Sequence, residues 1–403
     1  MEEYSEKNII PYFQPILCAA SNQIYSYEVL GRFTDKDGNV KSLGAFFSDP
    51  ATTHEEALRV DRIVRRKALE QYAREKRTEY LFVNIRLAWL DNYADNPEEL
   101  PTIKWAKEFG IDAGKIVIEI TEEEFIVSDE KQAKAYIDIL SYYKNSGCRI
   151  ALDDYGKNAS NIDRLAFLKP DIIKINIDYI HKSEDSYHYR KYLKSIASFA
   201  ESVGIEILYE GVETRKQLEI CISSRGKFYQ GYLIAYPQAS MKNAVFAHNV
   251  FSEAADEVYK KQYKKIIRND LFKSYLDSKV GYLLLDNPFV SEKENIEAFF
   301  SELCGEIPAV IRIYLCDKKG MQITDNYEWN SGSAEFGGYM GSNWAWRGFF
   351  QEAMDTFISG KKSGLSSPYR DFLSKKKIFT YFYALTADVY LFADITRMPV
   401  IFN

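Results

Sequence analysis

The chain has 403 residues, of which 46% are hydrophobic and 27% are charged, with a formal net charge of −6. This composition excludes a disordered protein, and the acidic balance argues against a DNA-binding protein, which needs a broad basic surface. At about 100 to 200 residues per domain, the length allows two or three domains. The N-terminus lacks the pattern of a signal peptide, and no apolar run of about 20 residues occurs, so we expect a cytoplasmic protein without a membrane span.

The cysteines and histidines do not form a recognisable site. The five cysteines are odd in number and lack C-x-x-C spacing, so neither a disulfide framework nor a zinc ribbon is expected, and we predict that most are buried. The four histidines are scattered, and we expect them to be surface or structural residues.

Strand-like and helix-like segments alternate over the first 240 residues. Two strands around a turn are predicted at residues 8–14 and 24–30. The helices that follow are predicted at residues 55–76, 101–109, 131–145, 161–167, 187–203 and 214–223. Regular alternation of this kind predicts a TIM-type (β/α)8-like barrel with an outer ring of helices.

Polar residues lie at or just after most of the apolar segments. They are Asn84, Glu119 with Glu122, Asp153 with Asp154, Lys174 and Glu210. Most successive members are separated by about one strand plus one helix, and the carboxyl ends of parallel barrel strands meet on one rim. We therefore expect the carboxylates among these side chains to form an oxygen-lined metal site on that rim.

The barrel is predicted to occupy residues 1–245 and to be followed by a helical connection at residues 246–280. Residues 238–280 contain neither Gly nor Pro, which is typical of one or two long helices. This helix could transmit a signal between domains or could only cover the barrel, and amphipathic spacing does not separate these two alternatives.

Residues 281–403 are predicted to form a smaller α+β domain. Strands are expected at residues 310–315, 322–324, 378–383 and 389–395, and helices at residues 293–303 and 344–359. The pattern is similar to PAS or Cache-like sensor domains, which implies an unknown small-molecule or protein signal. An apolar pocket could be lined by Trp344, Trp346, Arg347, Tyr369 and Tyr381, or these residues could simply be core and interface.

Eight motifs occur in a fixed order within residues 8–240. They are Gln14-Pro15-Ile16, Glu28-Val29-Leu30-Gly31-Arg32, Val83-Asn84, Glu119-Ile120-Thr121-Glu122, Asp153-Asp154-Tyr155-Gly156, Lys174-Ile175, Glu210-Gly211-Val212-Glu213-Thr214 and Gln230-Gly231-Tyr232. Together they resemble the EAL-domain family of cyclic di-GMP phosphodiesterases.

This resemblance implies hydrolysis of cyclic di-GMP to linear pGpG with Mg²⁺ or Mn²⁺. The implied metal ligands are Glu28, Asn84, Glu119, Asp153 and Asp154. Glu210 is implied as the general base, Lys174 as a water-positioning residue and Glu213 as a support for the metal-side loop. The implied substrate contacts are Gln14, Leu30, Arg32 and Gln230. The family also implies a homodimer, with residues 154–161 near its interface.

The chain departs from the family pattern at three places. Lys157-Asn158-Ala159-Ser160 replaces a Thr-Gly-Tyr-Ser stretch, Asn176 replaces an aspartate, and Arg86 replaces a small residue. These departures favour an alternative in which the protein binds cyclic di-GMP but hydrolyses it slowly or not at all. A third alternative, an unrelated barrel enzyme such as a glycosidase, would use paired carboxylates without a metal.

Overall fold

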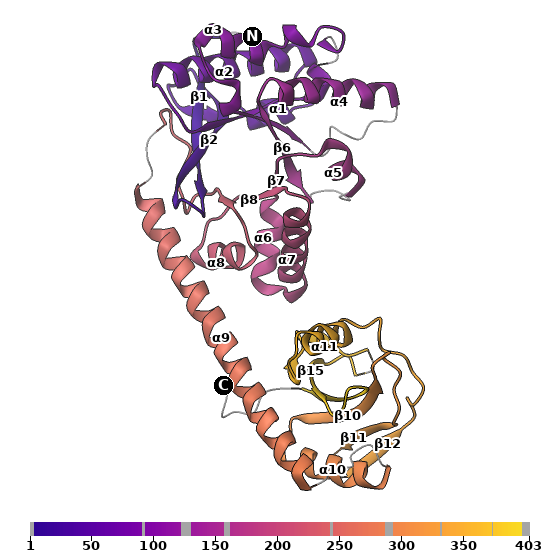
Figure 1. Cartoon of the computed structure of the whole chain (residues 1–403). Coiled ribbons are helices and arrows are strands. Elements are labelled where there is room, and N and C mark those ends of the chain that lie inside the picture. The colour runs from indigo at the N-terminus through magenta and orange to yellow at the C-terminus, as the bar shows by residue number, and fades with distance from the viewer. Residues whose placement is uncertain are drawn as a thin grey trace. The chain divides into compact units, whose positions relative to one another are not determined.

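The computed structural model describes residues 4–90, 93–121, 130–156, 162–241, 245–286, 293–330, 333–372 and 374–396 (Figure 1). The chain divides into two compact units, Met1–Tyr259 and Lys260–Asn403. Among the described residues, no helix has the length and apolar character needed to cross a membrane.

The first unit is a closed barrel. Its eight described strands are β1 (Ile9–Cys18), β2 (Gln23–Thr34), β4 (Tyr80–Asn84), β5 (Ile116–Thr121), β6 (Arg149–Tyr155), β7 (Ile172–Ile175), β8 (Glu206–Tyr209) and β9 (Phe228–Tyr229). The barrel closes because β1 pairs with both β2 and β9. The predicted TIM-type barrel is confirmed, with one reversed strand: β1 runs antiparallel to both neighbours, and the other barrel pairs are parallel.

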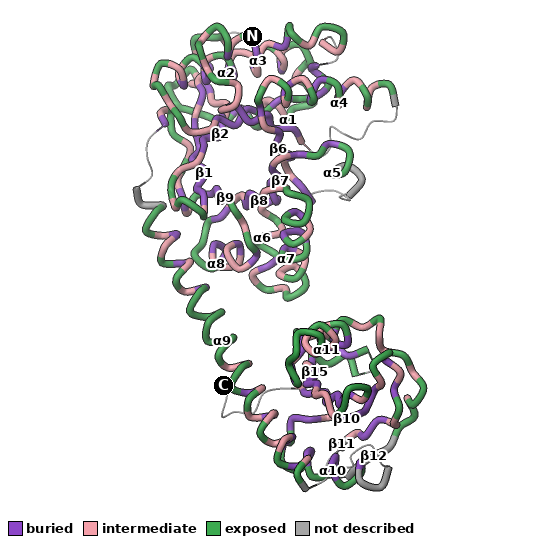
Figure 2. The backbone as a smooth tube through the Cα atoms, viewed as in Figure 1, coloured by how far each residue is buried: buried purple, intermediate pink, exposed green. Residues whose placement is uncertain are grey.

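Helices surround the barrel. They are α2 (His54–Arg74), α3 (Pro101–Phe109), α4 (Glu130–Asn145), α5 (Ile162–Leu168), α6 (Ile177–Asp185), α7 (Tyr187–Ser202) and α8 (Arg215–Ser223), with the short α1 (Gly44–Ser48) and the edge strand β3 (Val40–Ser42) after β2. Figure 2 shows largely buried strands and exposed outer faces of the helices. The strands are apolar runs because both of their faces are covered, as in β5, where Ile116 to Ile120 are all buried.

The predicted barrel helices match α2, α3, α4, α5, α7 and α8 to within two residues at each end. Helix α6 was missed. It starts directly after β7, where the side chain of Asn176 accepts a hydrogen bond from the Asp178 N–H and caps the helix. A capping residue can start a short helix without the long periodic pattern of apolar residues by which the other helices were predicted. All five cysteines are buried and free, as predicted for most of them.

The second unit contains an antiparallel sheet in the order β12-β11-β10-β16-β15-β13, with β14 paired to β15. The strands are β10 (Val310–Asp317), β11 (Asn326–Asn330), β12 (Ser333–Gly337), β13 (Ser363–Leu365), β14 (Tyr369–Arg370), β15 (Lys377–Ala384) and β16 (Val389–Ile395). The helices are α9 (Val245–Asp286), which begins in the first unit, α10 (Lys293–Glu306) and α11 (Gly348–Ile358).

Two apolar clusters cover opposite faces of this sheet. Ile313 and Leu391 pack with residues of α9 and α10, whereas their neighbours Tyr314 and Phe392 pack with α11. Successive residues of a strand point to opposite faces, so this alternation yields two layers of helices around the sheet.

The predicted strand at residues 322–324 was wrong. Gln322 makes only an isolated bridge to Cys316, and the Gln322 side chain instead donates to the Thr324 carbonyl and the Asn326 side chain. The predicted helix at residues 344–359 begins only at Gly348. Residues 344–347 instead form a turn in which the Arg347 N–H donates to the Trp344 carbonyl.

Candidate functional site

The polar residues predicted at strand ends converge at one end of the barrel. In the register of the sheet, Asn84 lies beside Glu119, and Thr121 lies beside Asp153. Glu28 enters from β2, where it faces Gln14 of the reversed strand. Parallel strands in this register bring their carboxyl ends together, so residues far apart in the sequence become neighbours.

Lys174 lies at the centre of this group. Its side chain is 1% exposed, and its Nζ lies 2.5 Å from Glu210 Oε1, 3.2 Å from Asp153 Oδ1 and 3.7 Å from Glu28 Oε1. Nζ also donates to Glu119 Oε1. One ammonium group is therefore shared by four carboxylates, with a fifth acid, Asp154, next to Asp153.

Burial and the charges of neighbouring groups shift the pKa values of these side chains. Burial raises the pKa of Glu119 and of Glu210 well above the usual range, and the neighbouring carboxylates add to this effect. Burial acts against the charge of Lys174, but the surrounding acids outweigh it and raise the pKa of the ammonium. For Asp153, burial is outweighed by the charge of Lys174 and by hydrogen bonds, so its pKa is lowered. The cluster therefore has more acids than its single cation can neutralise.

The donor set fits a hard divalent cation. Carboxylate oxygens of Glu28, Glu119 and Glu210 lie within 4.8 Å of one another, and so do those of Asp153, Asp154 and Glu210. Glu119 Oε2 is buried and has no hydrogen-bond partner among the residues that the structure describes. An unpartnered buried carboxylate oxygen among other oxygens is the ligand type that Mg²⁺, Mn²⁺ and Ca²⁺ prefer.

Amide side chains hold the carboxylates. Gln230 Nε2 donates to Glu28 Oε2 at 2.5 Å and to Gln14 Oε1 at 3.2 Å, and Asn84 Nδ2 donates to Glu28 Oε1 at 3.4 Å. Of the two predicted substrate contacts, Gln230 thus orients Glu28, and Gln14 in turn holds Gln230. On the other side of the cluster, Asn176 Nδ2 donates to Asp154 Oδ1 at 2.5 Å.

Two glycines allow the backbone to present Glu210. Gly211 has a φ of 62°, and a Cβ there would lie 2.2 Å from the Ile177 side chain. A Cβ on Gly231 would lie 2.2 Å from the backbone of Val212. Any larger residue at either position would displace the loop that carries Glu210.

Glu213 does not join the cluster. Its side chain is exposed, and its backbone N–H donates to the Gln217 side chain. Gln217 forms a capping box with Thr214 at the start of α8. Glu213 thus lies on the loop that follows Glu210. Its backbone N–H, and not its side chain, connects this loop to α8.

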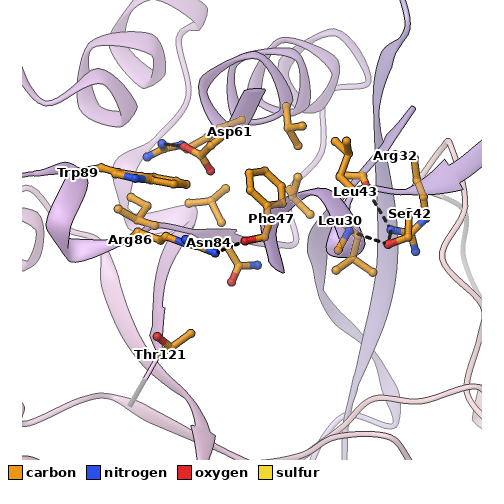
Figure 3. Close-up of a pocket in the computed structure, with 17 residues that line it drawn as sticks. Leu30, Arg32, Ser42, Leu43, Phe47, Asp61, Asn84, Arg86, Trp89 and Thr121 are labelled. Atoms are coloured by element: carbon orange, nitrogen blue, oxygen red, sulfur yellow. Dashed lines mark hydrogen bonds and ion pairs between the residues drawn. The ribbon is translucent and has the colours of Figure 1, made fainter. Parts of the chain in front are cut away.

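A cavity of about 280 Å³ adjoins the cluster and includes Asn84, Leu30 and Arg32 among its lining residues (Figure 3). Arg32 Nη1 donates to the Gly31 carbonyl at 2.9 Å and to Ser42 Oγ at 3.3 Å. The predicted contacts Leu30 and Arg32 therefore lie beside the acidic cluster.

Sequence reasoning missed the aromatic part of this cavity. Phe47 and Trp89 line it, and the guanidinium carbon of Arg86 lies 5.9 Å and 5.2 Å from their ring centres (Figure 3). Phe47 comes from the short helix α1 and Trp89 from a 3₁₀ turn, Leu87–Trp89, so neither occupies a strand end. Arg86, noted in the sequence only as a departure, was the available signal. Glu122 and Lys157 to Ser160 lie outside the described residues.

Comparison with known proteins agrees with the resemblance to the EAL-domain family. Residues 1–237 match the EAL domain model, and residues 250–401 match the model of an EAL-domain associated signalling protein domain. The PAS- or Cache-like character of the second unit stays a prediction, because its match is to this signalling domain.

The chain is 30% identical over 399 residues to the uncharacterized EAL-domain containing protein YkuI of Bacillus subtilis, covering 96% of this chain and 94% of that protein. The crystal structure of Bacillus subtilis YkuI with substrate c-di-GMP and calcium has a TM-score of 0.87 and 28% identity, and the match covers 98% of both chains. The probable cyclic di-GMP phosphodiesterase PdeB of Escherichia coli is 25% identical over 56% of this chain and 42% of its own length. The chain belongs to the EAL domain family.

Proposed function

We propose that the protein hydrolyses cyclic di-GMP to linear pGpG with a divalent metal ion, Mg²⁺ or Mn²⁺. The observation that carries this proposal is the gathering of four carboxylates around Lys174 with an unpartnered oxygen on Glu119. The YkuI structure with c-di-GMP and calcium supports the choice of ligand and of a hard cation.

The metal would be held by Glu28, Glu119 and Asp153, with Asn84 and Asp154 beside them. When bound, a divalent cation neutralises phosphate charge and lowers the pKa of a water ligand. These residues come from different strands, so the barrel fixes their relative positions before the substrate arrives.

In the reaction, a water oxygen attacks phosphorus and one P–O ester bond breaks. The leaving sugar oxygen takes up a proton from solvent and becomes a hydroxyl, which gives linear pGpG. Glu210 accepts the proton of this water, because its carboxylate is directed into the cluster and lies 2.5 Å from Lys174 Nζ. Lys174 directs its positive charge to the place where negative charge develops on the phosphate and holds Glu210 in position.

The adjoining cavity would receive the nucleotide. Arg32 offers a planar fork that suits phosphate oxygens, while Leu30 and the rings of Phe47 and Trp89 provide apolar surface for a guanine base.

The test is a chromatographic time course of pGpG formation by the full chain with Mn²⁺ or Mg²⁺. We expect product that disappears on chelation and in Glu210→Gln, but that persists in Glu201→Gln, which removes an exposed carboxylate paired with Arg225. Product formed in the presence of a chelator would instead support a metal-independent barrel enzyme.

A second candidate function is a receptor that binds cyclic di-GMP without efficient turnover. It is favoured by Asn176, whose amide holds Asp154 where the family resemblance implies a carboxylate. Binding of cyclic di-GMP by calorimetry, without pGpG in the time course, would establish this alternative.

Three further parts of this proposal extend from the family. We place the protein in the cytoplasm, as a homodimer, with its activity controlled by a signal at the second unit. Sedimentation of the purified chain would test the dimer.

A further inference from the structure

The second unit contains a cavity of about 420 Å³ between the sheet, the turn before α11, and β14. Its lining consists of aromatic and charged side chains with a few small polar ones: Arg312, Tyr314, Asn326, Tyr339, Ser342, Asn343, Trp344, Trp346, Arg347, Phe349, Tyr369, Asp371, Phe372 and Asp394. This volume suits a small organic molecule.

The two carboxylates of the cavity, Asp371 and Asp394, already accept hydrogen bonds from groups of the protein. Arg312 donates to Asp394 Oδ2 at 3.0 Å and to Asp371 Oδ1 at 3.4 Å. Asp394 Oδ1 also accepts from Thr380 at 2.7 Å, and Asp371 Oδ2 accepts from the Ser374 N–H at 2.8 Å. Because both carboxylates have donors, they create little demand for an added cation.

Two donors of the cavity have no acceptor. The guanidinium carbon of Arg347 lies 5.2 Å from the Trp346 ring centre, 5.3 Å from that of Tyr369 and 5.8 Å from that of Phe349, and Arg347 makes no side-chain hydrogen bond or ion pair within the described residues. Asn326 is 3% exposed, and its Oδ1 accepts from Gln322, but its Nδ2 finds no acceptor in the described part of the chain.

The aromatic walls are fixed in place. Trp344 Nε1 donates to Gln322 Oε1 at 2.7 Å, and Trp346 Nε1 donates to the Asn343 carbonyl at 3.1 Å. Arg347 is therefore held by stacking against rings, an arrangement that leaves its N–H groups available to a planar acceptor.

We propose that this cavity binds a small organic carboxylate, with the carboxylate on Arg347 and a flat apolar body between the aromatic side chains. The two open donors call for acceptor oxygens, and a guanidinium fork matches a carboxylate in bidentate geometry. A phosphate dianion fits less well because Asp371 and Asp394 lie in the same cavity and would repel its second charge.

The experiment uses the full chain and matched pairs of probes. Phenylacetate is compared with its uncharged analogue phenylacetamide, and L-phenylalanine tests whether an added ammonium group changes affinity. Inorganic phosphate is the competing anion. Binding is measured by calorimetry and by tryptophan fluorescence, since Trp344 and Trp346 line the cavity.

We expect at least one of the two carboxylates to bind and phenylacetamide and phosphate not to bind. In Arg347→Met, the affinity for the carboxylate should fall at least tenfold. Arg347→Lys should keep part of the affinity, because lysine has the positive charge but lacks the bidentate guanidinium group. Arg370→Met is the matched control, because Arg370 follows Tyr369 on β14 but is exposed and does not line the cavity.

The proposal would be overturned by binding of neither carboxylate, by equal binding of the amide, or by undiminished carboxylate binding by a folded Arg347→Met. Tighter binding of phosphate than of the carboxylates would also overturn it. The outcome does not depend on cyclic di-GMP turnover. Because Trp89 and Trp105 of the first unit also fluoresce, it is the comparison of the Arg347 variants with Arg370→Met that assigns the signal to the second unit.

Discussion

In the barrel, Lys174 is surrounded by four carboxylates, whereas in the second unit Arg312 is surrounded by three, those of Glu328, Asp371 and Asp394. The lysine is a compact charge, and within the described ranges Glu119 Oε2 beside it has no hydrogen-bond partner. The arginine spreads its donors over three acids, and Asp371 and Asp394 accept further bonds from Ser374 and Thr380.

The two clusters differ in how fully their carboxylate oxygens are paired within the described residues. The Arg312 cluster is complete without a ligand, which is the property of a structural ion network. The Lys174 cluster has four carboxylates for one cation and a buried carboxylate oxygen without a partner among the described residues, and we propose that a bound cation completes it. Both clusters have more acids than cations, so the feature that distinguishes the Lys174 cluster is the unpartnered oxygen of Glu119.

The largest effect is expected from Lys174→Met. Loss of this charge should reduce pGpG formation about 10³-fold, which corresponds to about 4 kcal/mol of activation free energy, because the phosphate loses electrostatic stabilisation. Lys216→Met, at an exposed residue of α8, should have no comparable effect. Added Mg²⁺ should raise the melting temperature of Lys174→Met more than that of the wild type, and an equal shift would contradict the charge-excess interpretation.

Arg312→Met should act on stability instead. Removing the shared cation leaves Asp371 and Asp394 buried without their partner, so we expect the free energy of unfolding to fall by about 3 kcal/mol. Calorimetry of the full chain would measure this loss, with Arg370→Met as the control. Rescue by Mg²⁺ would show that the two clusters are less different than proposed.

A smaller effect should come from the pH dependence of Asp394. Burial raises its pKa from 3.8 to about 6, although Arg312 acts in the opposite direction. Because the folded state holds this proton more tightly, the resulting stability is fully present below about pH 4 and is lost as the pH rises through 6. Relative to Asp394→Asn, the unfolding free energy of the wild type should therefore fall by about 2 kcal/mol between pH 4 and 6.5. Parallel urea titrations would check this, and identical slopes would contradict it.

The smallest expected effect is that of Asn176→Asp. A carboxylate at this position would add negative charge beside Asp154, so we expect Mn²⁺ to bind up to about tenfold more tightly. Aspartate can also cap α6, so the helix should persist. Calorimetric titration with Mn²⁺ would measure the change, and unchanged affinity would mean that this departure does not tune the metal site.

Much of the barrel could be predicted from the sequence, because strand ends and helices follow local patterns. Asn84 and Asp153 were found because each directly follows an apolar run, and Glu119 and Lys174 because each is a charged residue within such a run. Phe47 and Trp89 could not be found in this way, because a short helix and a turn bring them to the cavity only after folding.

In the second unit, the long strands β10, β15 and β16 were predicted, but β11, β12, β13 and β14 were missed. The sequence of β13, Ser363-Gly364-Leu365, has little intrinsic strand preference. It forms a strand because it pairs with β15 in the folded sheet. The open donors of Arg347 were likewise invisible, because a missing partner is a property of the folded neighbourhood.

The reversed strand β1 has a consequence for the modular use of the barrel. Phe13 and Gln238, near the beginning and the end of the barrel sequence, exchange two backbone hydrogen bonds, of 2.7 Å and 3.0 Å. The ring is thus fastened where its own chain enters and leaves, so further segments can be joined at either end without opening it.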